Sequence, residues 1–571
     1  MNQWIIISGA QAPDMVPFEG DPRFARIDCG PLRAWFRRDG RFVNDQLFAA
    51  DSRGMALCDG VVLNLAELKE EYGVEDFMGV LRRSWEETKG VFFKKFAGPF
   101  CGAVYDRERD VLTTYANQTG DSFVFYYNAA SCYMVSNDLN MIEELMRKNG
   151  LPRSLDEEAA RYLLSFAYMV DERTLFREIK RVLPGEMVRF SPEKGCERSY
   201  YHRFDFTPRP VSFEEAVELV DRGFRKAVRR CFEKDREYGV TEHLADLSGG
   251  LDSRMTAWVA HDMGYGPFVF LNYCQSGSKE LVCASGAASV LGGQFLHKQL
   301  DDASFLFEVD RLVEMNYGLS LFCGITGGEQ LLRSLSFRRF GLEHTGQIGD
   351  AVIGSLCKSA TVLPEGQHQF KYSRLISSDA PAETLSEHPS CEDFALYTRA
   401  FLGALSSHLI RRKYSYAVSP FIDPDFLALC MSIPLEYRQS HKLYWAWLDA
   451  KYSEAGALPS TRSRAGQGEW TKAQIRNARR RGAMALWRLG LLKRRPKPDT
   501  ANMNPLNEWY QTKPDLRAFL SNYERENFSL LDRWPETQAN ARQMSASGAA
   551  TDKLMALTLL AAVKRYFPPE P

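Results

Sequence analysis

The chain has 571 residues, and its 72 basic and 73 acidic side chains nearly cancel. This balance gives no global reason to expect a nucleic-acid partner, and the length predicts two or more domains. The 12 cysteines are scattered without a C-x-x-C pair, which argues against a zinc site or a disulfide framework and favours reduced, packed thiols.

The N-terminal third of the chain reads as strand-rich. Its first apolar run, Trp4 to Ile7, is too short for a signal sequence or a membrane span, so we expect a strand and a cytoplasmic protein without a membrane span. Further short apolar runs alternate with turn signals to about residue 205, and "DRERD" (106–110) predicts a hairpin turn. With helices expected at 65–72, 76–86 and 156–166, the pattern predicts an α+β domain of stacked sheets.

From about residue 212 the hydrophobic period becomes helical. Ser212 followed by Glu215 forms a capping box at the start of a long predicted helix. Strands are expected next at 242–247, 268–273 and 295–300, with helices between them. Because this is a βαβαβ order, it predicts an α/β domain with a parallel doubly wound sheet, followed by mostly helical chain to about residue 465.

The stretch 472–497 is strongly basic, with "KAQIRNARRRGAMALWRLGLLKRRPKP" between residues 472 and 498. The simplest interpretation is a solvated helix face followed by a linker. A surface for an acidic partner, such as a leader peptide or a protease, is the main alternative, and membrane-surface attachment is a minor one.

The turn in "LADLSGGLDSRMT" (244–256) predicts a phosphate site. Gly249 and Gly250 let an anion approach the backbone closely, and the following helix start offers N–H groups and the positive end of its dipole. We therefore expect free backbone N–H groups here, with hydroxyl donors from Ser248 and Ser253. Asp252 would repel a phosphate, unless a Mg²⁺ ion lies between them.

Other nucleotide motifs are missing from the chain. It contains no G-x-x-x-x-G-K-[ST] sequence, and no G-x-G-x-x-G follows a predicted strand. The S-G-G-x-D-S turn instead resembles the pyrophosphate loop of ATP pyrophosphatases, enzymes that cleave ATP between the α and β phosphates and adenylate a substrate.

Two further stretches narrow this resemblance to the asparagine synthetase family. "HTGQIGDAVIGSL" (344–356) and "SPFIDPDFLALCMSIP" (419–434) resemble the next two motifs of that family, in the same order and at similar spacing. "CDGVVLNLAELK" (58–69) and "FAGPFCGAVYDRERDVL" (96–112) resemble segments of its glutaminase domain. The resemblance implies an Ntn-amidotransferase-like domain of stacked sheets over 1–205 and a synthetase-type ATP-pyrophosphatase domain over 206–571.

The same resemblance implies ATP and Mg²⁺ as cofactors. Asp252 and Asp350 match the two aspartates that coordinate Mg²⁺ in the family. The positions that match its nucleotide-contacting residues are Leu247, Ser248, Gly249, Gly250, Asp252, Ser253, Phe270, Leu271, Thr345 and Gly346.

The glutaminase-like half departs from the family pattern. Residue 2 is Asn2, where the family has its N-terminal cysteine nucleophile, and Cys29, the nearest cysteine in sequence, has no α-amine of its own to act as base. The glutamine-holding residues are also replaced, at Asp59, Val61, Ala116 and Asn117. We therefore expect this domain to be catalytically inactive.

The synthetase half departs as well. Gln347 stands where the family has a glutamate, and a neutral amide can bind substrate but is no strong base. Arg464 aligns loosely with the phosphate-contacting lysine of the family, which leaves Arg462 and Lys442 as substitutes. Our catalytic candidates are Arg464, Gln347 and Lys442, and the general base stays open among Glu392, Asp393, Tyr397 and His408.

The sequence predicts an ATP-dependent, AMP-forming carbon–nitrogen ligase. It would adenylate the carboxylate of a small molecule or peptide and join it to an amine, as do β-lactam synthetases and lasso-peptide cyclases, branches without the N-terminal cysteine. One alternative is an amidating synthetase that uses free ammonia on a sugar acid or natural product. A second is a non-catalytic partner that binds ATP or peptide. The oligomeric state is left open.

Overall fold

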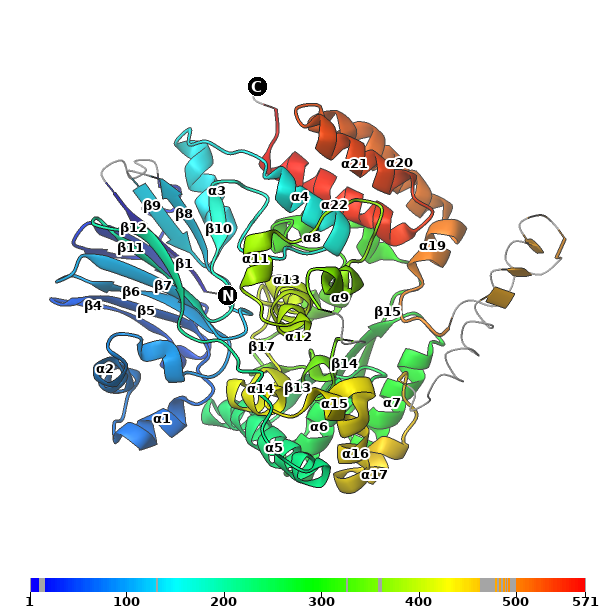
Figure 1. Ribbon diagram of the computed structural model, residues 1–571, viewed down its shortest axis with the longest axis horizontal. Coiled ribbons are helices and arrows are strands. Elements are labelled where there is room, and N and C mark those ends of the chain that lie inside the picture. The colour runs from blue at the N-terminus through cyan, green and yellow to red at the C-terminus, as the bar shows by residue number, and fades with distance from the viewer. Residues whose placement is uncertain are drawn as a thin grey trace.

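The computed structural model describes residues 2–9, 16–129, 132–324, 327–357, 362–462 and 500–569, with isolated positions between 478 and 492. The predicted basic stretch 472–497 therefore lies mostly outside the described residues. Figure 1 shows two stacked sheets on one side of the molecule, a third sheet surrounded by helices, and a layer of C-terminal helices against both.

The N-terminal part contains two six-stranded antiparallel sheets. The first has the strand order β10-β8-β9-β1-β3-β2. Its strands are β1 (Gln3–Ser8), β2 (Ala25–Cys29), β3 (Leu32–Arg37), β8 (Phe125–Ala129), β9 (Cys132–Ser136) and β10 (Ile179–Arg181). The second has the order β12-β11-β7-β6-β5-β4. Its strands are β4 (Leu47–Asp51), β5 (Gly54–Gly60), β6 (Phe100–Asp106), β7 (Val111–Ala116), β11 (Glu186–Ser191) and β12 (Gly195–Tyr200).

The two sheets pack face to face because their strands alternate. Trp4 and Ile6 of β1 point into a shared core with Leu57 of β5 and Ala103 of β6. The predicted hairpin at 106–110 joins β6 to β7. Helices cover the outer faces. Three of them, α1 (Leu65–Tyr72), α2 (Phe77–Thr88) and α4 (Glu157–Phe166), lie at the expected places, whereas α3 (Leu139–Lys148) was not predicted. The predicted stacked-sheet α+β architecture is confirmed.

The second part is built on a five-stranded parallel sheet with the order β15-β14-β13-β16-β17. Its strands are β13 (His243–Asp246), β14 (Phe268–Cys274), β15 (Gln294–Gln299), β16 (Glu343–His344) and β17 (Ala417–Val418). The connecting helices follow the predicted order, as α5 (Phe213–Glu237), α6 (Asp252–Asp262) and α7 (Lys279–Leu291). The α/β prediction is thus confirmed. Strands β16 and β17 were not predicted, because a strand of two residues is too short to show a hydrophobic period.

The capping box at the start of α5 is half formed. The Ser212 side-chain oxygen accepts a hydrogen bond from the backbone N–H of Glu215 at 3.1 Å, which fixes the first residue of the helix. Most of the remaining described chain is helical, as was expected to about residue 465. These helices are α8 (Val309–Asn316), α9 (Gly328–Arg333), α10 (Gly349–Val352), α11 (Ala382–Ser386), α12 (Cys391–Phe394), the π-helical η5 (Ala395–Gly403), α13 (His408–Arg411), α14 (Pro424–Met431), α15 (Leu435–Arg438), α16 (Lys442–Lys451), α17 (Ser453–Ala457), α19 (Leu506–Thr512), α20 (Pro514–Asn527), α21 (Pro535–Ala546) and α22 (Ala550–Tyr566).

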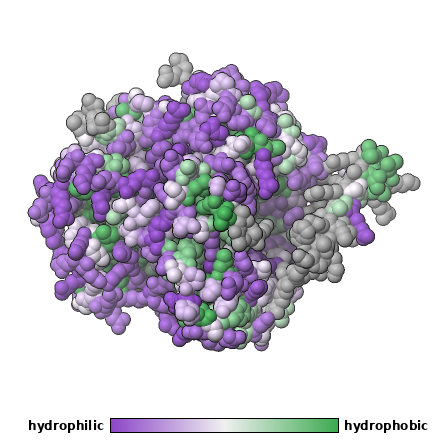
Figure 2. Space-filling model, viewed as in Figure 1, coloured by the Kyte–Doolittle hydropathy of each residue, from purple (hydrophilic) through white to green (hydrophobic). Residues whose placement is uncertain are grey.

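The C-terminal helix α22 joins the two parts. It packs against α8 of the second part and α4 of the first, and its side chains belong to the same apolar core as Ile5 and Ile7 of β1. The proposed division after residue 205 therefore runs through a continuous core and stays a prediction. Within the described residues, no helix combines the length and apolar character needed to cross a bilayer. The face shown in Figure 2 is mostly hydrophilic, with apolar residues gathered near its middle and on the extension at its edge.

Candidate functional site

The S-G-G turn lies at the carboxyl end of the central strand. Strand β13 runs between β14 and β16, and the backbone N–H of Leu247 donates to the carbonyl of Leu271 on β14 at 2.9 Å. The chain then turns at Ser248 and enters α6 at Asp252. Ligands of open parallel sheets bind outside the carboxyl ends of the strands, so the turn is placed where a nucleotide would bind.

The backbone N–H groups of this turn already have partners. Ser248 donates to the Ser253 hydroxyl at 2.8 Å, and Gly250 donates to the Ser248 hydroxyl at 3.2 Å. Gly249 donates to a carboxylate oxygen of Glu280 on α7 at 2.8 Å. The expectation of free N–H groups was wrong for these three residues, because neighbouring hydroxyls and a carboxylate satisfy the donors. A carboxylate oxygen is nevertheless the same kind of acceptor as a phosphate oxygen.

The second motif packs directly on the turn. A side-chain carbon on Gly346 would lie 2.1 Å from the backbone nitrogen of Ser253, so only glycine fits there. The backbone of Thr345 is anchored on both sides: its N–H donates to the carbonyl of Val418 at 2.7 Å, and its carbonyl accepts from the Thr256 hydroxyl at 3.1 Å. The structure thus brings the predicted residues Thr345 and Gly346 against the start of α6, directly after the S-G-G turn.

The two predicted metal ligands also meet. The backbone N–H of Asp350 donates to a carboxylate oxygen of Asp252 at 3.2 Å, and the two carboxylates come from α6 and α10. Burial, together with the charge of Asp350, raises the pKa of Asp252 to about 7. The two carboxylates supply oxygen ligands of the kind that Mg²⁺ prefers.

Among the described residues, Arg462 is the cationic side chain that lies beside Asp252 and Asp350. Its guanidinium donates to an Asp350 carboxylate oxygen at 2.8 Å and lies 2.6 Å from His441 Nε2. Arg464 lies outside the described residues, and Lys442 is exposed at the start of α16. Of the two substitutes that the sequence left open, the structure brings only Arg462 to the carboxylates. No sequence pattern pointed to Tyr444 on α16. In the structure, burial and the charge of the neighbouring Asp252 raise the pKa of its hydroxyl well above the usual value.

Gln347 directly follows Thr345 and Gly346 in the chain, and its side chain lies at a separate pocket. Its side-chain amide donates to the Ser407 hydroxyl at 2.8 Å, and it lines a cavity of about 280 Å³. Other lining side chains include Tyr168, Tyr273, Tyr372, Arg399 and Arg411. They come from widely separated segments, and no local motif in the sequence distinguishes them.

The candidates for a general base are engaged elsewhere in the described structure. Glu392 forms an ion pair with Arg438 at 2.8 Å, and Asp393 forms one with Arg203 at 2.8 Å. Tyr397 accepts a hydrogen bond from the backbone N–H of Phe204 at 3.0 Å. His408, the remaining candidate, faces a different cavity. None of the four is among the described residues that line the Gln347 pocket.

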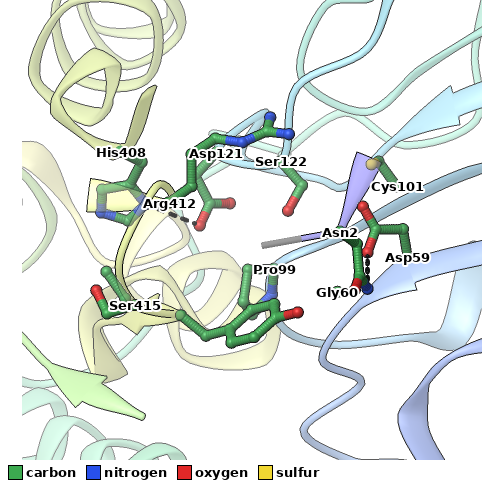
Figure 3. Close-up of a pocket in the computed structure, with 12 residues that line it drawn as sticks. Asn2, Asp59, Gly60, Pro99, Cys101, Asp121, Ser122, His408, Arg412 and Ser415 are labelled. Atoms are coloured by element: carbon green, nitrogen blue, oxygen red, sulfur yellow. Dashed lines mark hydrogen bonds and ion pairs between the residues drawn. The ribbon is translucent and has the colours of Figure 1, made fainter. Parts of the chain in front are cut away.

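The position of the family nucleophile is occupied by a closed polar network. The Asn2 amide donates to one Asp59 carboxylate oxygen at 2.7 Å, and Asn137 donates to the other at 2.7 Å. The side-chain amide oxygen of Asn2 in turn accepts from the backbone N–H of Asp39 at 2.8 Å. Figure 3 shows the Asn2–Asp59 hydrogen bond at the edge of a small cavity.

This cavity holds only about 50 Å³ and lies where the two parts of the chain meet. Nδ1 of His408, from the second part, lies 3.4 Å from a carboxylate oxygen of Asp121, from the first part (Figure 3). Cys101, not Cys29, lines the cavity, and burial raises the pKa of its thiol well above the usual value. Such a volume accommodates a few water molecules at most.

Comparisons with known proteins agree with this arrangement. A glutamine amidotransferase domain model matches residues 43–201. The glutamine-hydrolysing asparagine synthetase 1 of Bacillus subtilis is 21% identical over 263 residues, which are 45% of this chain and 40% of that protein. The putative glutamine-hydrolysing asparagine synthetase 1 of Methanocaldococcus jannaschii is 20% identical over 421 residues, 70% of this chain and 68% of that protein. The chain thus spans less than half the length of the first of these relatives.

Among solved structures, the NMN synthetase of Francisella tularensis is 13% identical, with a TM-score of 0.20, over 43% of this chain and 97% of that one. That similarity is too low to bear on the argument. The motifs at 247–253, 344–356 and 419–434, the matched domain model and the two relatives make the chain similar to asparagine synthetases.

Proposed function

We propose that the protein is an ATP-dependent, AMP-forming ligase that adenylates a substrate carboxylate and joins it to an amine. One observation carries this proposal. Asp252 and Asp350 converge at the S-G-G turn at the end of the central strand, and Gln347, three residues before Asp350, opens into a separate pocket. A nucleotide and an acid can therefore be held side by side.

The residues present fit ATP and a divalent cation. Ser248, Ser253 and the glycines would hold the linked phosphates, and Asp252 and Asp350 would hold Mg²⁺, which when bound supplies Lewis-acid stabilisation of phosphate charge. Glu280 must release the N–H of Gly249 for a phosphate oxygen to take its place. The backbone at Phe270 and Leu271 is proposed to face the adenine.

Arg462 is proposed to stabilise the charge that develops on the phosphates. It is fixed by Asp350 and His441, so its guanidinium is already oriented before the reaction. Arg464 stays a second candidate for the same role. Gln347 would orient the acid, because its amide is held by Ser407.

We infer that the nitrogen does not come from glutamine. Asn2 is bonded to Asp59 and Asp39, and the adjoining cavity is too small for a glutamine side chain. The preferred nitrogen donor is an amine of the substrate or of a second substrate, as in β-lactam synthetases and lasso-peptide cyclases. A leader-peptide or protease partner belongs to the peptide version of this proposal.

The test measures pyrophosphate and AMP after ATP and Mg²⁺ are mixed with candidate acids, each with an amine, with ammonium, or with neither. We expect acid-dependent release that Asp252→Asn and Asp350→Asn each reduce at least 100-fold. Asp515→Asn, an exposed aspartate in the first turn of α20, is the matched control. Release that requires ammonium identifies the amidating alternative, and ATP binding without release for any acid favours the non-catalytic one.

A further inference from the structure

The pocket beside Gln347 has a size and position suited to an organic acid. It lies near the carboxyl end of β14, at Tyr273, next to the turn that carries Thr345 and Gly346. Its volume of about 280 Å³ approaches the lower end of small-molecule sites, roughly 300 Å³, and is far larger than a single water or ammonia molecule needs. The pocket is therefore large enough for a small organic acid, whatever the nitrogen donor is.

One wall of the pocket is the π-helical segment η5, which contributes Arg399 and Gly403. Segments of this kind are rare and occur often at functional sites. A side-chain carbon on Gly403 would lie 3.1 Å from the ring of Tyr168, so this ring packs on bare backbone. The π-helical turn thereby presents Arg399 beside Tyr168.

Aromatic side chains hold the Arg399 guanidinium in place. It donates to the Tyr372 hydroxyl at 3.0 Å, and its carbon lies 5.2 Å from the centre of the Tyr372 ring and 6.0 Å from that of Tyr168. Only one of its five N–H donors is engaged in that hydrogen bond. A guanidinium held this way retains the paired donors that bind an anion with two hydrogen bonds.

The charges around the pocket distinguish its two arginines. Arg411 is buried and pairs with Asp246 at 2.8 Å and with Glu343, and it also donates to the Tyr273 hydroxyl. Arg399 forms no ion pair within the described residues, and no aspartate or glutamate is among the described residues that line the pocket. The charge of Arg411 is thus already compensated by the protein, whereas that of Arg399 is left for a ligand.

We propose that the acid substrate carries a second anionic group, a carboxylate or a phosphate, and that Arg399 is the specificity residue that binds it. The first carboxylate extends past Gln347 toward the nucleotide turn, while the body of the substrate lies among the rings of Tyr168, Tyr273 and Tyr372. This inference rests on the proposed adenylating function, because it assumes that the pocket holds the acid.

The test uses matched pairs of acids. Each pair differs only in the second group, as in the dipeptides Tyr-Glu and Tyr-Gln, or a phosphorylated sugar acid and its unphosphorylated form. Binding is measured by isothermal titration calorimetry with ATP absent, and turnover by pyrophosphate release. We expect the doubly anionic member to bind at least tenfold more tightly to the wild-type protein. Arg399→Met should abolish that preference, and Arg399→Lys should restore part of it.

Arg222→Met, an exposed arginine on α5, is the matched control and should keep the preference. The carboxylate and phosphate pairs show which anion Arg399 takes. Equal binding of both members of every pair to the wild-type protein, or an unchanged preference in Arg399→Met, overturns the inference. Pyrophosphate release from singly charged acids, independent of Arg399, overturns it while leaving the ligase proposal intact. Anion preference in binding without any pyrophosphate release contradicts the ligase proposal instead.

Discussion

A carboxylate oxygen of Glu280 lies 2.8 Å from the backbone nitrogen of Gly249, inside the turn that we propose holds the phosphates of ATP. Glu280 comes from the first turn of α7, and only one strand separates that helix from α6. Glu280 is itself mostly buried, and burial raises its pKa. A carboxylate and a phosphate cannot both accept from the same N–H group, so Glu280 competes with the nucleotide.

Glu280→Gln should therefore tighten ATP binding. The substitution keeps the shape of the side chain but removes a charge that both repels phosphate and holds the Gly249 donor. A charged hydrogen bond contributes about 1.5–3 kcal/mol, so we expect a decrease in the Kd for ATP of about tenfold. Calorimetric titration with ATP and Mg²⁺ measures it, with the exposed Glu436→Gln as control. Weaker binding would mean that Glu280 supports the turn rather than competing for it.

Arg462 and Lys442 should differ in their effect on catalysis. Arg462 contacts Asp350, whereas Lys442 is exposed at the start of α16. Because charge stabilisation at a reacting centre is worth about 100-fold in rate, Arg462→Ala should lower kcat for pyrophosphate release by about that factor. Lys442→Ala is expected to have the smaller effect. If the lysine variant is the more damaged of the two, the assignment of the cation reverses.

Asn2→Asp should destabilise the fold at neutral pH. The change puts a second carboxylate beside Asp59, where the Asn2 amide now donates at 2.7 Å. Losing that hydrogen bond inside the protein and adding a like charge should lower the free energy of unfolding by about 3 kcal/mol. Urea unfolding at pH 7 measures this loss, and Asn128→Asp, exposed on β8, should lose less than about 0.5 kcal/mol. Equal effects of the two changes would contradict the network.

His202 should make stability depend on pH. Burial, with a contribution from Lys94, lowers the pKa of His202 from 6.5 to about 4. Between these values the unfolded chain binds the proton and the folded chain does not, so stability falls as the pH is lowered from 6.5 toward 4. At pH 5 the loss from this group should be about 2 kcal/mol relative to pH 7.

His202→Gln removes the titrating group, so its unfolding free energy should change less between pH 7 and pH 5 than that of the wild-type protein. His261→Gln, which alters an exposed histidine in the last turn of α6, should leave the wild-type pH dependence in place. Parallel stability curves for the wild-type protein and His202→Gln would show that His202 does not titrate differently on folding.

The sequence by itself determined the elements that depend on local spacing. Helix α1 has its predicted bounds, Ser212 caps α5, and the βαβαβ order gave the parallel sheet with the S-G-G turn at the end of its central strand. The same local patterns predicted a helix directly after the turn that carries Asp252. Such features are predictable because hydrophobic period, capping and turn chemistry act over a few residues.

Only the tertiary structure decided which distant side chains share the site. Arg462 reaches Asp350 across 112 positions of sequence, Glu280 takes the donor of Gly249, and Arg399 enters a pocket whose walls come from several segments. No local pattern distinguishes these residues from other charged residues. Their roles depend on how helices and loops pack around the sheet, because packing alone sets which charges are buried together and which remain for a ligand.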